Sequence, residues 1–170
     1  MSARVVAKLG LFDYAAYHLR RNDLQYKEVF LSAQQSFDNT KALLRPGERI
    51  YLATDEMQQG FFKPFERQHE VLRWADFFTA RGGYALKGVR IPPKAVGLVE
   101  QIICAGARRF IGTQQSTFTG LIPRLRGYIG APDTTIYHHN VRYSKVPRPT
   151  RRPISGSDYM NAQTTLWADL

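Results

Sequence analysis

The chain has 170 residues, the size of one domain, and its composition of 44% hydrophobic and 22% charged residues is that of a folded globular protein. No apolar stretch approaches the ~20 residues of a membrane-spanning helix, and the single cysteine, Cys104, excludes an internal disulfide or a cysteine-based zinc site. The net charge of +10 favours an anionic partner, and composition alone leaves nucleic acid and a phosphorylated ligand both open.

The first half of the chain alternates strand patterns with helix patterns. One apolar run ends at Leu19, and a helix begins at Ser32, a suitable N-cap, and stops before Pro46. In chain order, we predict a strand over 14–19, a helix over 32–44, a strand over 49–54, a short helix over 64–69 and a strand over 71–74.

The second half contains the most regular helix pattern. From Pro93 to Ala107, apolar residues recur at helical spacing around most of the circumference, which predicts a buried helix. A strand over 109–113 follows directly, and another helix is predicted from Thr117 to Gly130, with Pro123 inside its first turns. This alternation predicts an α/β fold, Rossmann-like, with a parallel sheet and helices on both faces.

The periodic pattern ends at Pro132, and the remaining residues are rich in proline and arginine. We therefore predict one domain over 1–132 and an irregular basic tail over 133–170. The tail contains the neighbours His138 and His139, whose side chains would point to opposite sides of an extended segment. Because no cysteine or carboxylate cluster accompanies them, no metal site is predicted there.

A basic cluster follows the first predicted strand, where His18, Arg20 and Arg21 stand at its carboxyl end. Ligands of open α/β sheets bind beyond the carboxyl ends of the strands, and a guanidinium suits a phosphate or pyrophosphate. The alternative is that these side chains are only solvated.

A second phosphate-binding pattern lies at Ser116 and Thr117, where a helix is predicted to start after a strand. Hydroxyls and backbone N–H groups at a helix N-terminus favour an anion, although either residue can instead serve only as the helix cap. The segment is not a P-loop, and no glycine-rich dinucleotide fingerprint follows the first strand.

Three carboxylates stand near these segments. Asp55 and Glu56 follow the second predicted strand, where they suit acid–base chemistry, can form an acidic pair at a helix N-terminus, or can anchor the arginines of the first strand. Glu100 lies on the apolar helix and must find a partner there, either a structural residue or an N–H group of a ligand.

Four segments resemble, in their order and spacing, the GDP-fucose protein O-fucosyltransferase family, particularly the branch that modifies thrombospondin repeats and its algal and plant relatives. The resemblance covers about Leu9 to Gly130. Its motifs are Tyr17 to Asp23, Ile50 to Glu56, Val99 to Ala105 and Phe110 to Phe118.

The resemblance implies an inverting, metal-independent glycosyltransferase of the GT-B type, whose C-terminal Rossmann-like domain binds GDP-fucose. Arg20 would then contact the β-phosphate as the catalytic residue, with His18 beside it. The phosphates would be held by Ser116, Thr117 and the backbone of Phe118. Glu100 would read guanine in place of the family's usual Asp, and Arg21 and Asp55 would support the site.

The resemblance also implies what lies outside this chain. The family's N-terminal domain would precede the His18 motif, so we expect only the donor-binding half of a cleft here, with a protein or glycan hydroxyl as the acceptor. Residues 1–8 do not predict a signal peptide. An endoplasmic reticulum or Golgi location would therefore need an upstream targeting sequence.

The alternative to an enzyme is a non-catalytic binding or structural protein that reuses the fold, with its basic tail on an acidic partner or nucleic acid. Nucleic acid is the less favoured partner, because the basic residues are scattered in pairs rather than gathered into one stripe.

Overall fold

The computed structural model describes residues 1–22, 25, 30–131, 135–138 and 144–145. Helices and strands alternate along most of the chain, as the sequence predicts. In chain order the elements are α1 (Ser2–Leu9), β1 (Ala15–Leu19), α2 (Ala33–Thr40), the 3-10 turn η2 (Lys41–Leu43), β2 (Ile50–Thr54), α3 (Lys63–Glu66), β3 (Val71–Leu72), the 3-10 turn η3 (Trp74–Phe78), α4 (Pro93–Ala105), β4 (Arg109–Thr113), α5 (Thr117–Tyr128), β5 (Thr135–His138) and β6 (Ser144–Lys145).

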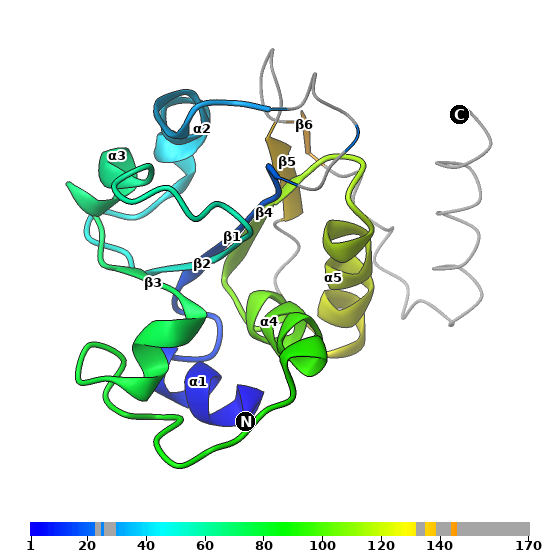
Figure 1. Ribbon diagram of the computed structural model, residues 1–170. Coiled ribbons are helices and arrows are strands. Elements are labelled where there is room, and N and C mark those ends of the chain that lie inside the picture. The colour runs from blue at the N-terminus through cyan, green and yellow to red at the C-terminus, as the bar shows by residue number, and fades with distance from the viewer. Residues whose placement is uncertain (23–24, 26–29, 132–134, 139–143, 146–170) are drawn as a thin grey trace.

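The strands form one sheet in the order β3-β2-β1-β4-β5-β6 (Figure 1). Every neighbouring pair is parallel except β5 and β6. The chain moves outward from β1 to β3 and then continues on the other side of β1 with β4. The predicted α/β fold with a parallel sheet is therefore confirmed. The strand order reverses between β1 and β4, which is the switch point where ligands of such sheets bind.

Each face of the sheet has its own hydrophobic core, because alternate strand residues point to opposite faces. One core lies under α1, α4 and α5 and contains Tyr14, Tyr51 and Phe110. The other lies under α2 and α3 and contains Tyr17 and Phe65. Helices thus cover both faces, as the sequence predicts (Figure 1).

Element boundaries agree best with prediction where local chemistry sets them. Ser32 caps α2 through a reciprocal pair, in which its hydroxyl accepts from the Gln35 N–H at 3.1 Å and the Gln35 side chain accepts from the Ser32 N–H at 3.0 Å. The predicted third strand is shorter, because β3 ends at Leu72 and Trp74 begins η3.

Three local features differ from the sequence prediction. The helix α1 was not predicted, and it buries Val5 and Leu9 against the sheet. The helix α4 is not buried all round, since Leu98 and Ile102 are 61% and 47% exposed on its outer side. Pro123 lies in the middle of α5 rather than in its first turns.

The sheet also extends beyond residue 132, the predicted end of the domain. The strands β5 and β6 belong to the stretch predicted as an irregular tail, and β5 pairs with β4. The rest of that tail, including His139, lies outside the described residues. None of the described helices is long and apolar enough to cross a membrane.

Candidate functional site

The carboxyl ends of β1 and β4 are joined at the switch point by one threonine. The hydroxyl of Thr113, the last residue of β4, donates to the carbonyl of His18 at 2.9 Å and accepts from the backbone N–H of Arg20 at 3.0 Å. This pair of contacts holds the backbone of Arg20 directly beyond the switch point. Thr113 is the residue that brings the first basic motif beside the loop before α5.

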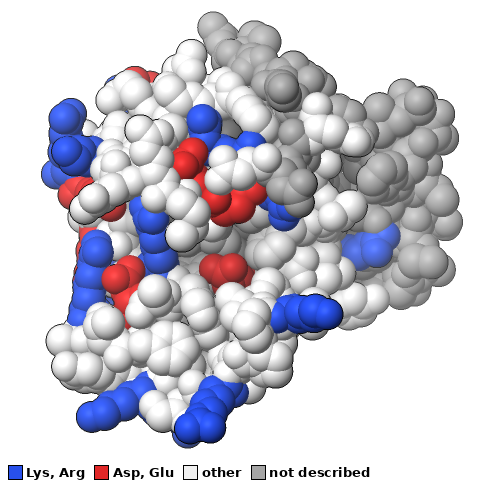
Figure 2. Space-filling model, viewed as in Figure 1, with Lys and Arg blue, Asp and Glu red and all other residues white. Residues whose placement is uncertain are grey.

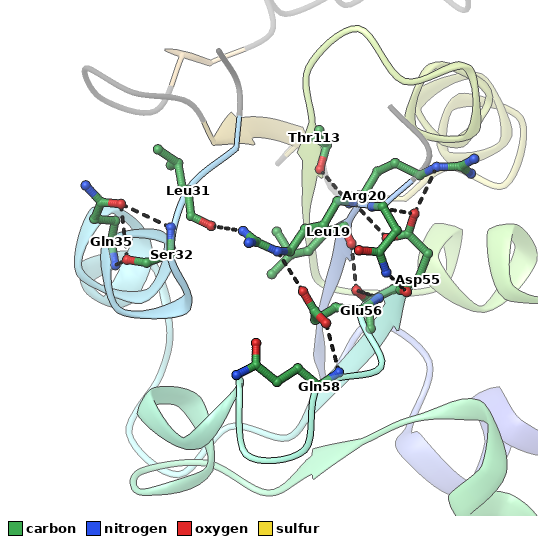
Figure 3. A network of polar contacts seen from close by, with 12 residues as sticks. Leu19, Arg20, Leu31, Ser32, Gln35, Asp55, Glu56, Gln58 and Thr113 are labelled. Atoms are coloured by element: carbon green, nitrogen blue, oxygen red, sulfur yellow. Dashed lines mark hydrogen bonds and ion pairs between the residues drawn. The ribbon is translucent and has the colours of Figure 1, made fainter. Parts of the chain in front are cut away.

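Arg20 leaves β1 on the side of α5 (Figure 3). Its Nε forms an ion pair with Asp55 at 3.2 Å, and its side chain remains 31% exposed. A guanidinium that is partly open to solvent can present donors to an anion. The structure thus places Arg20 where the sequence predicts an anion site.

Asp55 organises the loop after β1. Its carboxylate accepts from the backbone N–H groups of Arg21 at 2.7 Å and Asn22 at 3.1 Å, in addition to its ion pair with Arg20. The sequence left open whether Asp55 serves acid–base chemistry or anchors the arginines, and these contacts favour the anchor.

Glu56, the next residue, is also an anchor. It accepts from the backbone N–H of Gln58 at 2.8 Å and from the Nε of Arg21 at 2.9 Å. The Gln58 N–H, followed by Arg21, holds the pKa of Glu56 below its usual range. A carboxylate stabilised in its ionised form is poorly suited to shuttling protons near neutral pH.

Arg21 reaches in the opposite direction from Arg20. Its guanidinium donates to the carbonyl of Leu31, the residue before the cap of α2, and lies 4.3 Å from the ring centroid of Phe61. In Figure 3 the Leu31 contact lies on the far side of the network from Arg20. Arg21 therefore ties the β1 loop to α2 and supports the site from behind.

The first turn of α5 presents exposed polar groups. Ser116 occupies the N-cap position, yet its side chain makes no capping hydrogen bond, and Thr117 is exposed. Gln115 before them has a φ of 60°, a left-handed conformation that is uncommon outside glycine. The Ser116 hydroxyl therefore does not serve as the cap that the sequence allowed, and phosphate binding by it stays a prediction.

Phe118 and His18 form the floor beside this turn. The two rings are stacked, with centroids 4.1 Å apart and planes inclined by 19°. His18 is 3% exposed, and its Nδ1 lies 2.7 Å from the hydroxyl of Thr119. On the other side of the same turn, the Gln101 side chain donates to the carbonyl of Phe118 at 3.2 Å.

Glu100 lies deeper along the sheet. Its carboxylate accepts from the Tyr51 hydroxyl at 2.8 Å. Burial raises the pKa of Glu100 to about 7, although the Tyr51 hydrogen bond acts in the opposite direction. The partner that the sequence required for Glu100 is thus Tyr51 on β2, and the carboxyl lies on the same face of the sheet as His18.

The structure therefore brings most predicted site residues to one place. The Thr113 contacts and the stack of His18 on Phe118 bring the end of β1, with Arg20, near the start of α5, where Ser116 and Thr117 lie. Glu100 lies farther in, and Arg21 faces the other side. Sequence reasoning missed Thr113, Thr119 and Gln101. The hydroxyl at a strand end was the one available signal for Thr113.

The charges around the site do not form a single basic track. Figure 2 shows lysine and arginine side chains scattered over the face viewed, with acidic side chains among them. Within the described part of the chain, no group of histidine, cysteine or acidic residues has the arrangement of a metal site.

Comparison with known proteins adds an independent finding. A model of the GDP-fucose protein O-fucosyltransferase family matches residues 3–129. The proteins called GDP-fucose protein O-fucosyltransferase 2 from Homo sapiens and Pan troglodytes are each 27% identical to this chain over 142 residues, which is 81% of the chain. The match covers 31% of each relative, so the chain spans about a third of the length of the curated relatives it matches.

Proposed function

Because this chain belongs to the GDP-fucose protein O-fucosyltransferase family, we propose that its sheet binds the GDP-sugar donor of a fucosyltransferase reaction. The chain carries the donor-binding half of the cleft, and a second half, which contacts the acceptor, completes the enzyme. The acceptor is a hydroxyl of a protein or glycan. Two relatives named GDP-fucose protein O-fucosyltransferase 2 support this assignment.

One observation carries the proposal. At the switch point, Arg20 is held beside the start of α5 by the Thr113 hydroxyl and the Asp55 carboxylate. A guanidinium and a helix N-terminus are the two groups that proteins use most readily for phosphate. Their meeting at the ligand-binding edge of a parallel sheet fits a nucleoside diphosphate.

The proposed reaction is an inverting displacement. The acceptor oxygen forms a bond to the anomeric carbon of fucose from the side opposite GDP, and the bond from that carbon to the β-phosphate oxygen breaks. The bonding electrons leave with GDP, and the acceptor hydroxyl loses its proton to a base of the other half of the cleft.

Arg20 acts on the leaving group in this proposal. Negative charge grows on the β-phosphate as the bond breaks, and a preorganised guanidinium stabilises that charge more in the transition state than in the ground state. Ser116 and the α5 N-terminus hold the phosphates in place, which is the work that a metal ion does in other transferases. The mechanism therefore needs no metal cofactor.

Glu100 is proposed to read the base. An ionised carboxylate can accept both the ring N–H and the amino N–H of guanine, in the same way that carboxylates accept from base edges elsewhere. The hydrogen bond from Tyr51 orients the carboxylate for that contact.

A non-catalytic binding protein that reuses the fold is the second candidate, and the observation that favours it is the basic composition of the C-terminal segment. In that case the basic C-terminal segment binds an acidic partner. Such binding weakens steeply with added salt and does not depend on Arg20.

The experiment that separates these functions is a thermal unfolding series with GDP and GDP-fucose. At a hundredfold excess over Kd, binding adds about 2.7 kcal/mol to the free energy of unfolding. Arg20→Ala should lose this stabilisation, whereas Arg67→Ala, an exposed arginine after α3, should keep it. No stabilisation of the wild-type chain by millimolar GDP would contradict donor binding.

Catalysis is tested separately by supplying the other half of the cleft. Adding the N-terminal part of a related fucosyltransferase in trans should restore fucose transfer with the wild-type chain and not with Arg20→Ala. GDP binding without transfer under those conditions would favour the non-catalytic candidate.

A further inference from the structure

A charged groove lies beyond the ends of β2 and β3, away from the switch point between β1 and β4. Its volume is about 440 Å³, which is within the range of ligand sites. The residues that line it come from the loop after β2, from α3 and from the segment after β3. Because β2 and β3 are parallel, the groove opens at the same edge of the sheet as the donor site. Its charged side chains are Lys63, Glu66, Arg73, Asp76 and Arg81.

One pair of these charges has a structural use. The guanidinium of Arg81 donates to the carbonyl of Val71 at 2.6 Å and lies 3.7 Å from the carboxylate of Asp76. Asp76 also accepts from the backbone N–H of Arg73 at 2.7 Å. Arg81 and Asp76 therefore hold the segment after β3 in place and largely neutralise each other.

The side chain of Arg73 is held in a different way. Its guanidinium carbon lies 4.9 Å from the ring centroid of Phe62, which is fully buried. A contact between a cation and a ring face fixes the guanidinium without a hydrogen bond. Within the part of the chain that the structure describes, no hydrogen bond or ion pair involves this guanidinium. Arg73 is thus preorganised, and its N–H donors are available to a ligand.

Lys63 supplies the second available cation. Gly60 has a φ of 75°, and a Cβ there would fall 3.0 Å from Cε and 3.6 Å from Nζ of Lys63. The absence of a side chain at Gly60 lets the lysine lie against the loop that lines the groove. Glu66 stands one turn further along α3, yet among the described residues no ion pair joins it to Lys63.

The balance of charge in the groove favours a carboxylate over a phosphate. Lys63, Arg73 and Arg81 stand against Glu66 and Asp76, which leaves an excess of one positive charge. A carboxylate carries a single negative charge, whereas a phosphate monoester carries about −1.5 to −2 at neutral pH and would be repelled more strongly by Glu66. The planar fork of a guanidinium also matches the two oxygens of a carboxylate.

We propose that this groove binds a carboxylate side chain of an acidic polypeptide segment, which Arg73 and Lys63 receive together. A polypeptide is favoured because Lys63, Glu66 and Arg81 are exposed, so a free carboxylate would gain little from such ion pairs alone. Among the described residues that line the groove, none offers an aromatic face on which a sugar ring could stack.

The groove is joined to the donor site by one loop. Gly60 lines the groove, while Glu56 and Phe61 of the same loop contact the guanidinium of Arg21. A polypeptide bound in the groove would therefore lie beside the bound donor. That the segment belongs to the acceptor protein rests on the proposed function, whereas the carboxylate site follows from the groove itself.

The test is a titration followed by ¹H–¹⁵N NMR, without GDP and at about 0.15 M salt, where distant charges are screened. The probes are a six-residue peptide with two central glutamates, blocked at both ends, and the same peptide with glutamines. The reporters are the backbone amide of Gly60 and the Nε–H of Arg73.

Two variants of equal charge are compared with the wild-type chain. One combines Lys63→Met with Arg73→Met, because methionine keeps an unbranched stem against Phe62. The control combines Arg90→Met with Lys94→Met, which removes the same charge from exposed residues outside the groove. Circular dichroism and thermal unfolding establish that both variants are folded.

The glutamate peptide should shift both reporter signals, and the glutamine peptide should not. The groove variant should bind the glutamate peptide about three- to twentyfold more weakly, as expected for the loss of two partly exposed ion pairs. The control variant should stay within about twofold of the wild-type chain, because its charges act only from a distance.

Three results would overturn the inference: equal binding of the two peptides, equal weakening in the two variants, or tighter binding of free glucuronate than of the glutamate peptide. Failure of the wild-type chain to bind GDP in a separate titration is a different outcome. It overturns the proposed function and the acceptor role of the groove, while peptide binding would still establish the carboxylate site.

Discussion

Arginines lie at both edges of the sheet, but they are held in different ways. At the amino edge, Arg108 makes two contacts of 2.6 Å to Glu48, and their side chains are 13% and 2% exposed. Beside them, the buried Arg126 donates to the carbonyls of Ala105, Ala107 and Arg108. At the carboxyl edge, Arg20 has a longer ion pair to Asp55 and is 31% exposed.

The comparison separates two uses of the same side chain. A guanidinium enclosed by carbonyls or by a bidentate carboxylate closes the turn between α4 and β4 and contributes to stability. A guanidinium that is partly exposed to solvent contributes less to stability and can present donors to an anion. Arg126 therefore contributes to folding, whereas Arg20 is the residue that we propose binds the ligand.

The largest expected effect is on stability at the amino edge. Arg126→Met fills similar volume but leaves the carbonyls at the end of α4 without a donor. Hydrogen bonds to charged groups contribute about 1.5–3 kcal/mol each, so we expect a loss of about 3 kcal/mol or more in the free energy of unfolding. Urea denaturation measures it.

The matched variant at the carboxyl edge is Arg20→Ala. Because exposed ion pairs contribute at most about 1 kcal/mol, it should unfold within about 1 kcal/mol of the wild-type chain. If Arg126→Met and Arg20→Ala lowered the free energy of unfolding equally, the arginines at the two edges would not differ in their contribution to stability.

A smaller loss of stability is expected at the contact between β4 and α5. Gly112→Ala places a Cβ against Thr119, and overpacking of this kind costs about 1–3 kcal/mol. Gly97→Ala on α4 is the control, since its Cβ would meet Phe118 at an ordinary 3.7 Å. A Gly112→Ala chain as stable as this control would contradict the tight packing.

The anchor of Arg20 can be weakened without removing Arg20 itself. Asp55→Asn keeps the shape but loses the charge that holds the guanidinium and the two backbone N–H groups of Arg21 and Asn22. We expect about 1 kcal/mol lower stability and about tenfold weaker GDP binding. Glu56 contacts Arg21 rather than Arg20, so Glu56→Gln should weaken GDP binding less than Asp55→Asn does. A larger loss of GDP affinity in Glu56→Gln than in Asp55→Asn would contradict the assignment of the two anchors.

The smallest expected effect is the dependence of the free energy of unfolding on pH that Glu100 causes. The pKa of Glu100 is raised from 4.5 in the unfolded chain to about 7 in the folded chain. Its contribution to the free energy of unfolding is therefore present below about pH 4.5 and is lost as the pH rises toward 7. Relative to Glu100→Gln, the wild-type chain should lose free energy of unfolding across that interval. Parallel pH curves for the two chains would show that Glu100 ionises normally.

The pH dependence of ligand binding should have the opposite sign. If the ionised carboxylate reads guanine, GDP affinity should rise with pH up to about 7, by at most tenfold per pH unit, and then level off. Glu100→Gln should flatten this rise. Calorimetric titrations between pH 6 and pH 8 on both chains measure it.

The fold could be predicted where short-range chemistry determines it. Apolar runs identified β1, β2 and β4, and the cap at Ser32 identified the start of α2. The helix α1 and the exposed Leu98 and Ile102 of α4 could not be predicted, because they depend on which surfaces the rest of the chain covers.

The chemistry of single residues identified the parts of the candidate site, whereas their assembly was expected only from the family resemblance. Arg20 and Ser116 carry recognisable phosphate chemistry, whereas their meeting depends on β1 and β4 being neighbours, which sequence periodicity does not encode. Thr113, Thr119 and Gln101 were missed for the same reason, since each acts through a contact with a residue distant in sequence.

The most direct test of the account is a calorimetric titration of GDP into the wild-type chain, Arg20→Ala and Arg67→Ala. The account predicts that the wild-type chain and Arg67→Ala bind GDP alike. Arg20→Ala should bind about 10- to 100-fold more weakly while keeping its stability, as expected for the loss of charge-assisted hydrogen bonds to phosphate. GDP binding by Arg20→Ala at wild-type affinity would contradict the assignment of Arg20 to the ligand.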